Sequence, residues 1–431
     1  MNKDKWKNIQ GKLSDKLQFL KLGEEPELED EIQIEEETLF SDAAAGAKLP
    51  EDDFEAKLAR NRKWVFRRRI ILAAVVLAVI GGFVLYNVLT TFRDYVIVDS
   101  YENEVSAGSE YVAAGNRIYR YSTDGISCVS RRNELQWSIT YNMQAPIADV
   151  CGETMAVAEQ QGNQVYVVNE DGLVGNFETL LPILKVRVSR QGVVAVVLQE
   201  EDVSWVNLYQ ADGTAIAEDK TTVTESGYPL DIDLSPDGQK LAVSYLGVKE
   251  GMISSDVVFY HFGSAGQAEN DYVVSRETYT DTVIPEIYFT DNARAVAVAD
   301  NGYMVFRGSD APEQSEIVTF EEEILSTFHD EDAIGFLFES REEGYAYRME
   351  LYNYRGRRRF SKNLNSEFER IKIQNGQILM YSDRSIDIIT SSGQMRFTSA
   401  YEKSIADIFY FSEFRKYLVI TDEGFDRIRI G

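Results

Sequence analysis

The chain has 431 residues, 44% of them hydrophobic, so it can bury a substantial core and contain more than one folding unit. Its formal net charge is -27, and 54 acidic against 29 basic residues follow Asp94, so most of the negative charge lies in the C-terminal part. This charge argues against nucleic-acid binding, because neutralising phosphates requires Lys and Arg. Two cysteines, Cys128 and Cys151, exclude a disulfide framework and a Cys-rich zinc site. They leave open one bridge, with two buried thiols as the favoured alternative.

The first 22 residues predict a basic amphipathic helix, with lysines between apolar residues at steps of three and four. The apolar positions are Trp6, Ile9, Leu13, Leu17 and Leu20. Such a helix suits an anionic inner leaflet or the groove of a partner, whereas the alternative is a marginal helix that frays. Residues 23–51 are rich in acidic residues and are predicted to be disordered.

A helix predicted over residues 52–69 runs into an uncharged apolar stretch, which predicts a transmembrane helix over residues 70–91. About twenty such residues match a hydrocarbon core of ~30 Å. Basic residues crowd its N-terminal side, whereas Arg93 stands alone among acidic residues after it. This asymmetry predicts a cytoplasmic N-terminus and an extracellular C-terminal part. The basic residues are Arg60, Arg62, Lys63, Arg67, Arg68 and Arg69.

Eight near-continuous apolar segments of strand length recur after Tyr95, each followed by a second strand that ends in a Gly or Asn turn. Successive turns lie 37 to 50 residues apart. A four-stranded propeller blade takes about 40 to 50 residues, so the period predicts an all-β, eight-bladed β-propeller over residues 94–431. Seven blades are the alternative, if one weak repeat is misread. The turns end at Asn133, Gly172, Gly213, Gly263, Gly308, Gly356, Gly393 and Gly431.

The last repeat stops at Gly431 without an outer strand. The segment Asp94–Tyr101 precedes the first full repeat and resembles other outer strands, such as the one that begins at Tyr272. We therefore expect it to complete the last blade and to remove an exposed sheet edge.

The layout of tail, span and repeats such as DIDLSPDGQKLAVSY (Asp231–Tyr245) resembles a bacterial family catalogued as domain of unknown function 5711. The resemblance covers the span and everything after it. It implies a membrane-anchored propeller in the cell envelope of a Gram-positive bacterium, and it brings no known activity. The SPDG segment (Ser235–Gly238) is also similar to TolB-like and WD40-like repeats, which indicate blade geometry and not a function.

A run of arginines, Arg355, Arg357, Arg358 and Arg359, forms a strongly basic cluster in this acidic part of the chain. It is a candidate contact for an anionic envelope polymer, a lipid headgroup surface or an acidic partner, through charge-assisted hydrogen bonds. The favoured alternative is a charged turn that keeps a sheet edge soluble.

Three predicted inner strands carry acidic residues that could converge in the central channel. These acidic residues are Asp149, Asp231, Asp233 and Asp407. The alternative roles for these carboxylates are to cap turns or to bind neighbouring blades through hydrogen bonds.

Common catalytic and cofactor motifs are absent from the sequence, which has no G-x-S-x-G, no H-E-x-x-H and two histidines, His261 and His329. We therefore expect no metal and no cofactor. The leading hypothesis is a non-enzymatic binding or scaffold module for a cell-envelope protein or polymer. The alternative is a hydrolase or lyase that acts on envelope glycans through the channel carboxylates.

Overall fold

The computed structural model of the protein describes residues 64, 66–79, 81–82, 90–102, 108–201, 203–222, 226–249, 251–365, 368–411 and 415–431. Residues 64, 66–79 and 81–82 are helical. No helix within the described residues has the length and apolar character needed to cross a membrane. The predictions for residues 1–22 and 23–51 lie outside the described residues. So do residues 52–63 and 65 of the predicted juxtamembrane helix and residues 80 and 83–89 of the predicted span.

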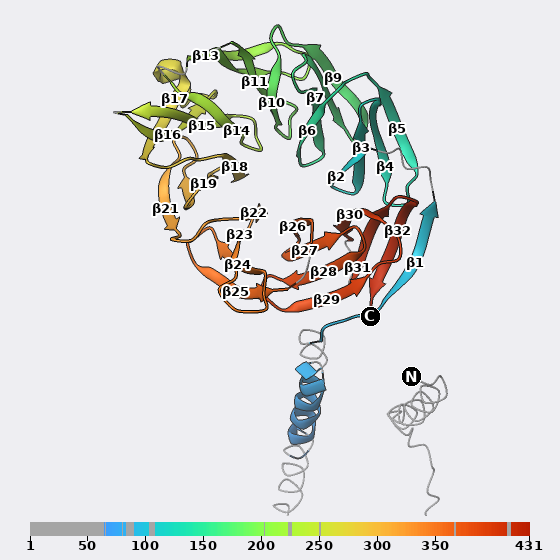
Figure 1. Ribbon diagram of the computed structural model, residues 1–431. Helices are drawn as coiled ribbons and strands as arrows, with labels where there is room; N and C mark the ends of the chain where they lie inside the picture. Colours follow the sequence, from blue (N-terminus) through green and yellow to red (C-terminus); the bar gives the residue numbers. More distant parts are fainter. Residues whose placement is uncertain are drawn as a thin grey trace, which may run out of the picture. The chain divides into compact units, whose positions relative to one another are not determined.

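The described strands form eight antiparallel four-stranded sheets, arranged as blades in a ring (Figure 1). This confirms the predicted eight-bladed propeller and removes the seven-bladed alternative. We number the blades in chain order. Blades 1 to 3, each from inner to outer strand, consist of β2 (Glu110–Ala114), β3 (Arg117–Ser122), β4 (Gly125–Ser130) and β5 (Leu135–Thr140), then β6 (Pro146–Cys151), β7 (Thr154–Glu159), β8 (Gln164–Asn169) and β9 (Gly172–Glu178), then β10 (Ile183–Val188), β11 (Val194–Glu200), β12 (Val203–Tyr209) and β13 (Ala215–Thr222).

Blades 4 to 7 follow the same order. They consist of β14 (Tyr228–Leu234), β15 (Lys240–Lys249), β16 (Met252–His261) and β17 (Val273–Thr280), then β18 (Glu286–Asp291), β19 (Arg294–Ala299), β20 (Gly302–Arg307) and β21 (Glu313–Thr319), then β22 (Ser326–His329), β23 (Ala333–Glu339), β24 (Tyr347–Asn353) and β25 (Arg358–Leu364), then β26 (Arg370–Gln374), β27 (Gln377–Ser382), β28 (Ser385–Thr390) and β29 (Met395–Ala400). Two short 3-10 turns, η1 (Gly266–Ala268) and η2 (Asn270–Tyr272), precede β17.

Blade 8 combines both ends of the described ring. It contains β30 (Ile405–Tyr410), β31 (Lys416–Thr421), β32 (Gly424–Ile430) and, as its outer strand, β1 (Tyr95–Glu102). In the antiparallel pairing, Tyr95 lies opposite Ile430. The predicted closure of the ring is therefore confirmed, and Figure 1 shows β1 along the outer edge beside β32.

A buried carboxylate fixes this closure. Asp426 on β32 is 0% exposed and accepts hydrogen bonds from the hydroxyls of Ser100 on β1 (2.5 Å) and Tyr401 (2.8 Å). The ammonium of Lys403 lies 3.0 Å from the same carboxylate. One side chain therefore links the first strand, the last strand and the connection from blade 7.

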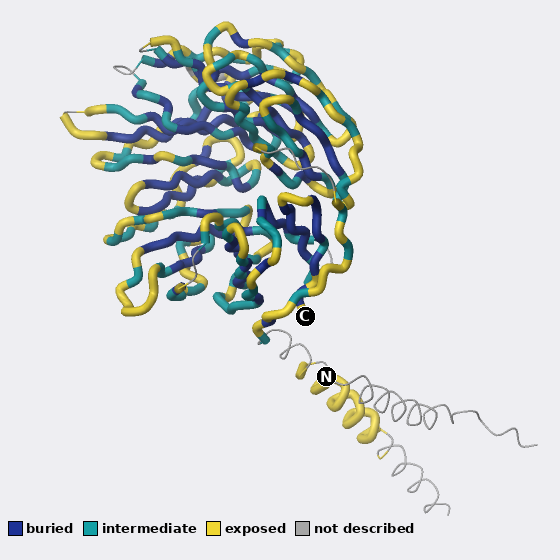
Figure 2. Tube along the Cα trace, turned by 45° about the vertical axis from the view of Figure 1, so that its right-hand side comes forward, coloured by how far each residue is buried: buried dark blue, intermediate teal, exposed yellow. Residues whose placement is uncertain are grey.

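The apolar core lies between neighbouring blades. The second strands are buried over most of their length, as in β7 and β11, because both faces of these sheets pack against other blades. One core cluster joins Ala156 and Val165 of blade 2 to Val186 and Val196 of blade 3. Outer strands such as β9 alternate between exposed and half-buried residues, and Figure 2 shows the buried segments concentrated within the ring.

Tight turns connect the third and outer strands, and glycine is needed there for two reasons. Gly393 has φ +85, and a Cβ built on it would lie 2.7 Å from Cγ of Phe360 on the outer strand of the preceding blade. Gly213 repeats this arrangement with φ +86 and Phe177. Asn133, with φ 59, takes the corresponding place in blade 1, since Asn tolerates the left-handed region better than most residues.

Strand direction defines one face of the ring, which we call the proximal face. It carries the turns from inner to second strands and from third to outer strands, for example residues 329–333 and 353–358, and also Tyr95, where β1 begins beside the end of β32. Just before β1, the backbone of Phe92 exchanges hydrogen bonds with Arg396 and Thr398 near the start of β29 (2.9 and 3.1 Å). The N-terminal segment therefore joins the ring on the proximal face.

Candidate functional site

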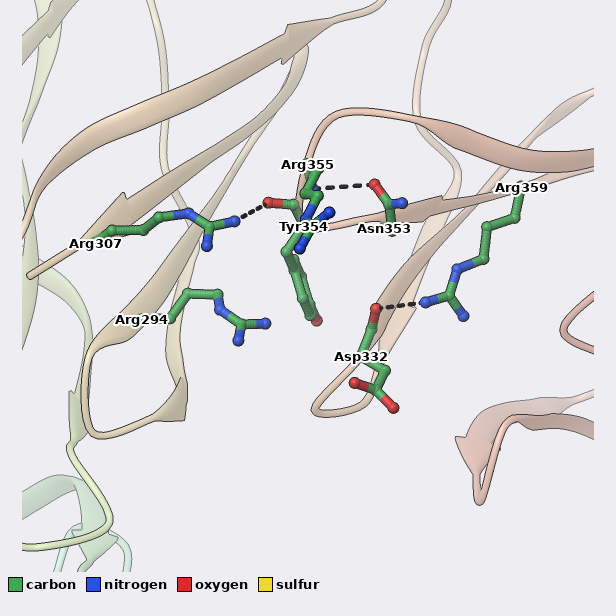
Figure 3. A pocket seen from close by; sticks show the side chains of 7 residues that line it. All are labelled: Arg294, Arg307, Asp332, Asn353, Tyr354, Arg355 and Arg359. Atoms are coloured by element: carbon green, nitrogen blue, oxygen red, sulfur yellow. Dashed lines mark hydrogen bonds between the residues drawn. The ribbon is translucent and has the colours of Figure 1, made fainter.

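A basic pocket opens on the proximal face between blades 5 and 6 (Figure 3). The cavity has a volume of about 330 Å³, and four guanidinium groups but one carboxylate are among its lining side chains. The lining residues are Arg294, Arg307, Asp332, Asn353, Tyr354, Arg355 and Arg359.

Blade 5 supplies two of the arginines. Arg294 at the start of β19 lies opposite Arg307 at the end of β20, so both side chains leave the same face of the sheet. Arg307 donates a hydrogen bond to the carbonyl of Tyr354 in blade 6 (2.7 Å). Arg294 pairs with Asp291 (2.7 Å), and its guanidinium lies 5.7 Å from the centre of the Tyr354 ring. Blade packing therefore sets the positions of these two groups.

Blade 6 supplies the other two, Arg355 from its turn between the third and outer strands and Arg359 from the start of β25. The side-chain oxygen of Asn353 accepts hydrogen bonds from the backbone N–H groups of Arg355 (3.0 Å) and Arg357 (3.1 Å), which fixes the turn. Arg359 donates to the carbonyl of Asp332 (3.0 Å). The buried Tyr354 forms the wall between the two blades and donates from its hydroxyl to the carbonyl of Asp330 (2.7 Å).

Three of the four guanidinium groups have no carboxylate partner among the described residues. Within the part of the chain that the structure describes, no Asp or Glu oxygen lies within 4.0 Å of a guanidinium nitrogen of Arg307, Arg355 or Arg359. Guanidinium groups present planar sets of donors that match phosphate and carboxylate oxygens. The pocket is thus equipped to bind an oxyanion.

The predicted arginine cluster divides into three parts. Arg355 and Arg359 line the pocket, whereas Arg358 donates to Glu350 (3.0 Å) and Arg357 is exposed and outside the lining. Sequence reasoning missed Arg294 and Arg307, because they lie in another blade and reach the pocket through blade packing. A predicted register between blades 5 and 6 would have been needed to find them.

The four acidic residues predicted for the channel do lie on inner strands, and three of them bind the next blade. Asp149 accepts a hydrogen bond from the N–H of Val188 (2.7 Å). Asp231 accepts from Ile287 (3.0 Å) and Asp233 from Phe289 (2.6 Å). These carboxylates therefore link the inner strand of one blade to that of the next.

Asp407 occupies a separate position on β30. It pairs with Lys372 on the inner strand of blade 7 (2.6 Å) and accepts a hydrogen bond from the Tyr381 hydroxyl (2.5 Å). Burial lowers the pKa of Lys372, while the charge of Asp407 opposes this shift. This pair joins blades 7 and 8 across their core.

Two basic residues of β10 compensate the aspartates of blade 4. Lys185 and Arg187 lie 2.8 and 3.2 Å from Asp231, and Arg187 lies 3.6 Å from Asp233. Burial raises the pKa of Asp233 to about 8, and the charge of Asp149 adds to this shift. Burial also raises the pKa of Asp149. Asp149, Asp231 and Asp233 thus form one cluster of interacting carboxyl groups around Arg187.

Comparison with known proteins identifies the family. Residues 88–430 match a family of unknown function (DUF5711). The chain belongs to this family. This confirms the family resemblance expected from the repeats, and none of the curated proteins compared with this DUF5711 protein matches it.

Several solved structures are similar to the DUF5711 protein. BamB from Moraxella catarrhalis shares 10% identity with a TM-score of 0.46, over 78% of this chain and 98% of its own. A eukaryotic initiation factor shares 13% identity with a TM-score of 0.47, over 75% and 84%. An acylaminoacyl peptidase from Pyrococcus horikoshii shares 12% identity with a TM-score of 0.40, over 64% and 48%. Similarity at this level concerns the fold and carries no functional assignment.

The described residues of the DUF5711 protein do not form a metal site. Within the described ranges, no group of three or more His, Cys, Asp or Glu side chains could hold a metal ion. His329 instead bonds with Glu286 (3.1 Å) and stacks on Tyr288. Cys128 and Cys151 are free thiols and form no bridge with each other; Cys128 is buried as expected, whereas Cys151 is half-buried.

The pKa of Asp233 predicts a pH dependence of stability. Because the pKa rises from 3.8 in the unfolded chain to about 8 in the folded protein, the folded state binds more protons between these values. Stability therefore falls as the pH rises from about 4 to about 8, by at most about 1.4 kcal/mol per pH unit from this group. Asp233→Asn should flatten the profile of unfolding free energy against pH.

Urea unfolding at several pH values measures this profile. Asp300→Asn, which changes an exposed carboxyl in blade 5, is the matched control and should leave the slope as it is in the natural protein. An equal slope in the Asp233→Asn variant would show that Asp233 keeps an ordinary pKa in the folded state.

Proposed function

We propose that this DUF5711 protein is a membrane-anchored, extracellular β-propeller that acts as a non-enzymatic binding module and holds an oxyanion in the basic pocket. The apolar stretch over residues 70–91 and the basic residues before it support the anchor and its direction. The observation that carries the binding role is the convergence of Arg307, Arg355 and Arg359 on one cavity without carboxylate partners among the described residues.

The charge of the surrounding domain strengthens this proposal. Residues after Asp94 include 54 acidic and 29 basic residues, so carboxylates are abundant on the surface. Like charges repel one another by about 1 kcal/mol at 4 Å even in water, and more near protein. Arginines held together with no carboxylate partner among the described residues of such a domain are therefore best explained by an anion that neutralises them.

The basic pocket opens on the face of the ring at which the chain enters from the proposed span. Strand β1 begins at Tyr95, shortly after the end of the proposed span at residue 91, and it begins on the proximal face. The basic pocket opens on the same face. Phosphate groups near the outer surface of a membrane belong to lipid headgroups or to phosphate-containing envelope polymers, and both offer the oxygens that guanidinium groups bind.

The cytoplasmic tail would give the binding module an inner contact. We propose that the amphipathic helix over residues 1–22 rests on the anionic inner leaflet through its apolar face. The span then couples the outer propeller to this helix.

The enzymatic alternative has less support. General acid and base chemistry on a glycan requires carboxyl groups that are available to the substrate. Asp149, Asp231 and Asp233 instead accept hydrogen bonds from the next blade, and Asp407 pairs with Lys372. These contacts give the acidic residues a role in joining blades.

Titration of the full-length protein in detergent micelles tests the binding role. The probes are pyrophosphate, dihexanoyl phosphatidylglycerol and a soluble poly(glycerol phosphate), measured by calorimetry. The double variant Arg355→Gln and Arg359→Gln should raise the dissociation constant about 10-fold or more, because each charge-assisted hydrogen bond contributes about 1.5–3 kcal/mol. Arg357→Gln removes one charge from the same turn but not from the pocket, and it should leave the constant within about twofold.

The arms of this experiment separate the possible sources of the anion. Binding of the lipid alone assigns a headgroup, and binding of the polymer alone assigns an envelope polymer. An equal loss of affinity in Arg357→Gln and in the double variant would show a diffuse charge effect. Unchanged affinity in the double variant would remove the basic pocket as the site.

A further inference from the structure

A second cavity lies on the proximal face between blades 3 and 4. Its charged lining residues are acidic, whereas those of the basic pocket are mostly arginines. This second cavity has a volume of about 130 Å³ and combines aromatic rings, carboxylates and aliphatic side chains. The lining residues are Val206, Ala217, Glu218, Asp219, Leu241, Tyr260, Phe262, Asp271 and Tyr272. We call it the aromatic pocket.

Three aromatic rings form one side of the aromatic pocket. The rings of Tyr260 and Phe262 are parallel within 2°, with their centres 6.5 Å apart. Tyr272, in η2, lies 5.6 Å from Phe262. The faces of such rings carry partial negative charge and attract cations.

The carboxylate of Asp219 also lines the pocket. It accepts a hydrogen bond from the Tyr260 hydroxyl (2.9 Å), which in turn lies 2.9 Å from the Tyr245 hydroxyl. Burial raises the pKa of Asp219, and the negative charge of Asp271 adds to this shift. The two carboxylates thus face a common space.

No basic side chain neutralises these carboxylates within the described residues. No Lys, Arg or His nitrogen there lies within 4.0 Å of Asp219 or Asp271. Arg276 is close enough to lower the pKa of Asp219, but its guanidinium pairs with Asp256 (3.2 Å). The carboxyl groups that line the pocket therefore favour a cationic ligand.

We propose that the aromatic pocket binds an alkylammonium group, as a protonated primary amine or a quaternary ammonium. The rings face the cation, Asp219 and Asp271 neutralise it, and Val206, Ala217 and Leu241 contact its methyl or methylene groups. The small cavity suits a compact cation at the end of a chain. This site is separate from the proposed oxyanion site and does not depend on it.

Such an ammonium group can come from a lysine side chain of a partner or from the headgroup of an aminolipid. The shared chemistry is the alkylammonium group, and the experiment includes both sources. The probes are tetramethylammonium, n-butylammonium, acetyl-lysine amide and dihexanoyl phosphatidylethanolamine, with tert-butanol as the neutral control. Binding to the full-length protein in detergent micelles is measured by calorimetry and by saturation-transfer NMR.

We expect tetramethylammonium or n-butylammonium to bind and tert-butanol not to bind. Asp219→Asn should weaken binding about 10-fold, and Tyr272→Leu about 3- to 10-fold, within the range expected for one aromatic contact. Asp212→Asn, an exposed change in the same blade, is the matched control and should leave binding unchanged. Thermal unfolding of each variant confirms that the ring remains folded.

Two results would overturn the proposal. One is a failure of both ammonium probes to bind, and the other is equal weakening by Asp212→Asn and Asp219→Asn. The double variant Arg355→Gln and Arg359→Gln should bind ammonium like the natural protein, so failure of the oxyanion site and failure of this site are distinguishable. Binding of the lysine derivative or of the lipid then identifies the source.

Discussion

Replacing Asp231 with alanine should lower the free energy of unfolding by about 3–5 kcal/mol, the loss expected when one partner of a buried ion pair is removed. Asp231 is 2% exposed and accepts hydrogen bonds from Lys185 (2.8 Å), Arg187 (3.2 Å) and the backbone of Ile287 (3.0 Å). Without the carboxylate, Lys185 and the Ile287 N–H lose this acceptor and Arg187 keeps only its weaker contact with Asp233 and the Val186 carbonyl, at the contact of blades 3, 4 and 5. Urea unfolding measures the change.

Two further variants define the origin of this loss. Asp231→Asn keeps an oxygen that can accept from Ile287, so it should cost less than the alanine variant. Glu277→Ala removes an exposed carboxylate from the outer strand of the same blade and should change stability by less than about 0.5 kcal/mol. A loss below about 1 kcal/mol in Asp231→Ala would mean that these contacts contribute little to the joining of the blades.

Asp426→Ala should be comparably destabilising, by about 3–5 kcal/mol, and its effect should appear first at the closure of the ring. The carboxylate is 0% exposed and holds Ser100, Tyr401 and Lys403 together. In its absence β1 loses a contact to β32, while the ladder between these strands remains. Native-state hydrogen exchange should therefore show faster exchange in β1 and β32 than in blade 4.

The control for this experiment lies in the same blade. Asp422 is exposed in the turn before β32, and Asp422→Ala should leave both stability and exchange close to those of the natural protein. Uniform acceleration of exchange in all blades of the Asp426→Ala variant would contradict a local role of Asp426 in closure.

The propeller could be predicted from the sequence because its main signals are local. The buried second strands are nearly continuous apolar runs, and a Gly or Asn ends the strand after each of them. The closing strand followed from a count, since the last repeat lacks an outer strand and Asp94–Tyr101, before the first full repeat, resembles the other outer strands. The contacts of Asp426 could not be predicted, because they join residues far apart in the sequence.

The candidate site was only partly accessible from the sequence. Arg355 and Arg359 were conspicuous in a run of basic residues. The same run did not indicate that Arg358 lies outside the pocket and binds Glu350 instead. Arg294 and Arg307 come from the neighbouring blade. The inner-strand aspartates were found by their position in the repeats. Their partners on β10 and β18 could not be predicted, because they depend on the relative positions of the inner strands of neighbouring blades.

The aromatic pocket was missed for a similar reason. Tyr272 was read as the start of an outer strand, whereas it belongs to η2 and faces Phe262. The pairing of Asp219 with Tyr260 joins blades 3 and 4. Neither contact leaves a pattern in the sequence, because the first depends on the connection between β16 and β17 and the second on how blade 3 packs against blade 4.

A structure of the full-length protein with bound tungstate, a heavy oxyanion, would show whether the basic pocket holds an anion. We expect an anomalous density peak in the cavity between blades 5 and 6, within hydrogen-bond distance of Arg307, Arg355 and Arg359. We also expect the peak to disappear in the double variant Arg355→Gln and Arg359→Gln and to remain in Arg357→Gln. An empty cavity at saturating tungstate, or a peak that persists in the double variant, would contradict oxyanion binding at this site.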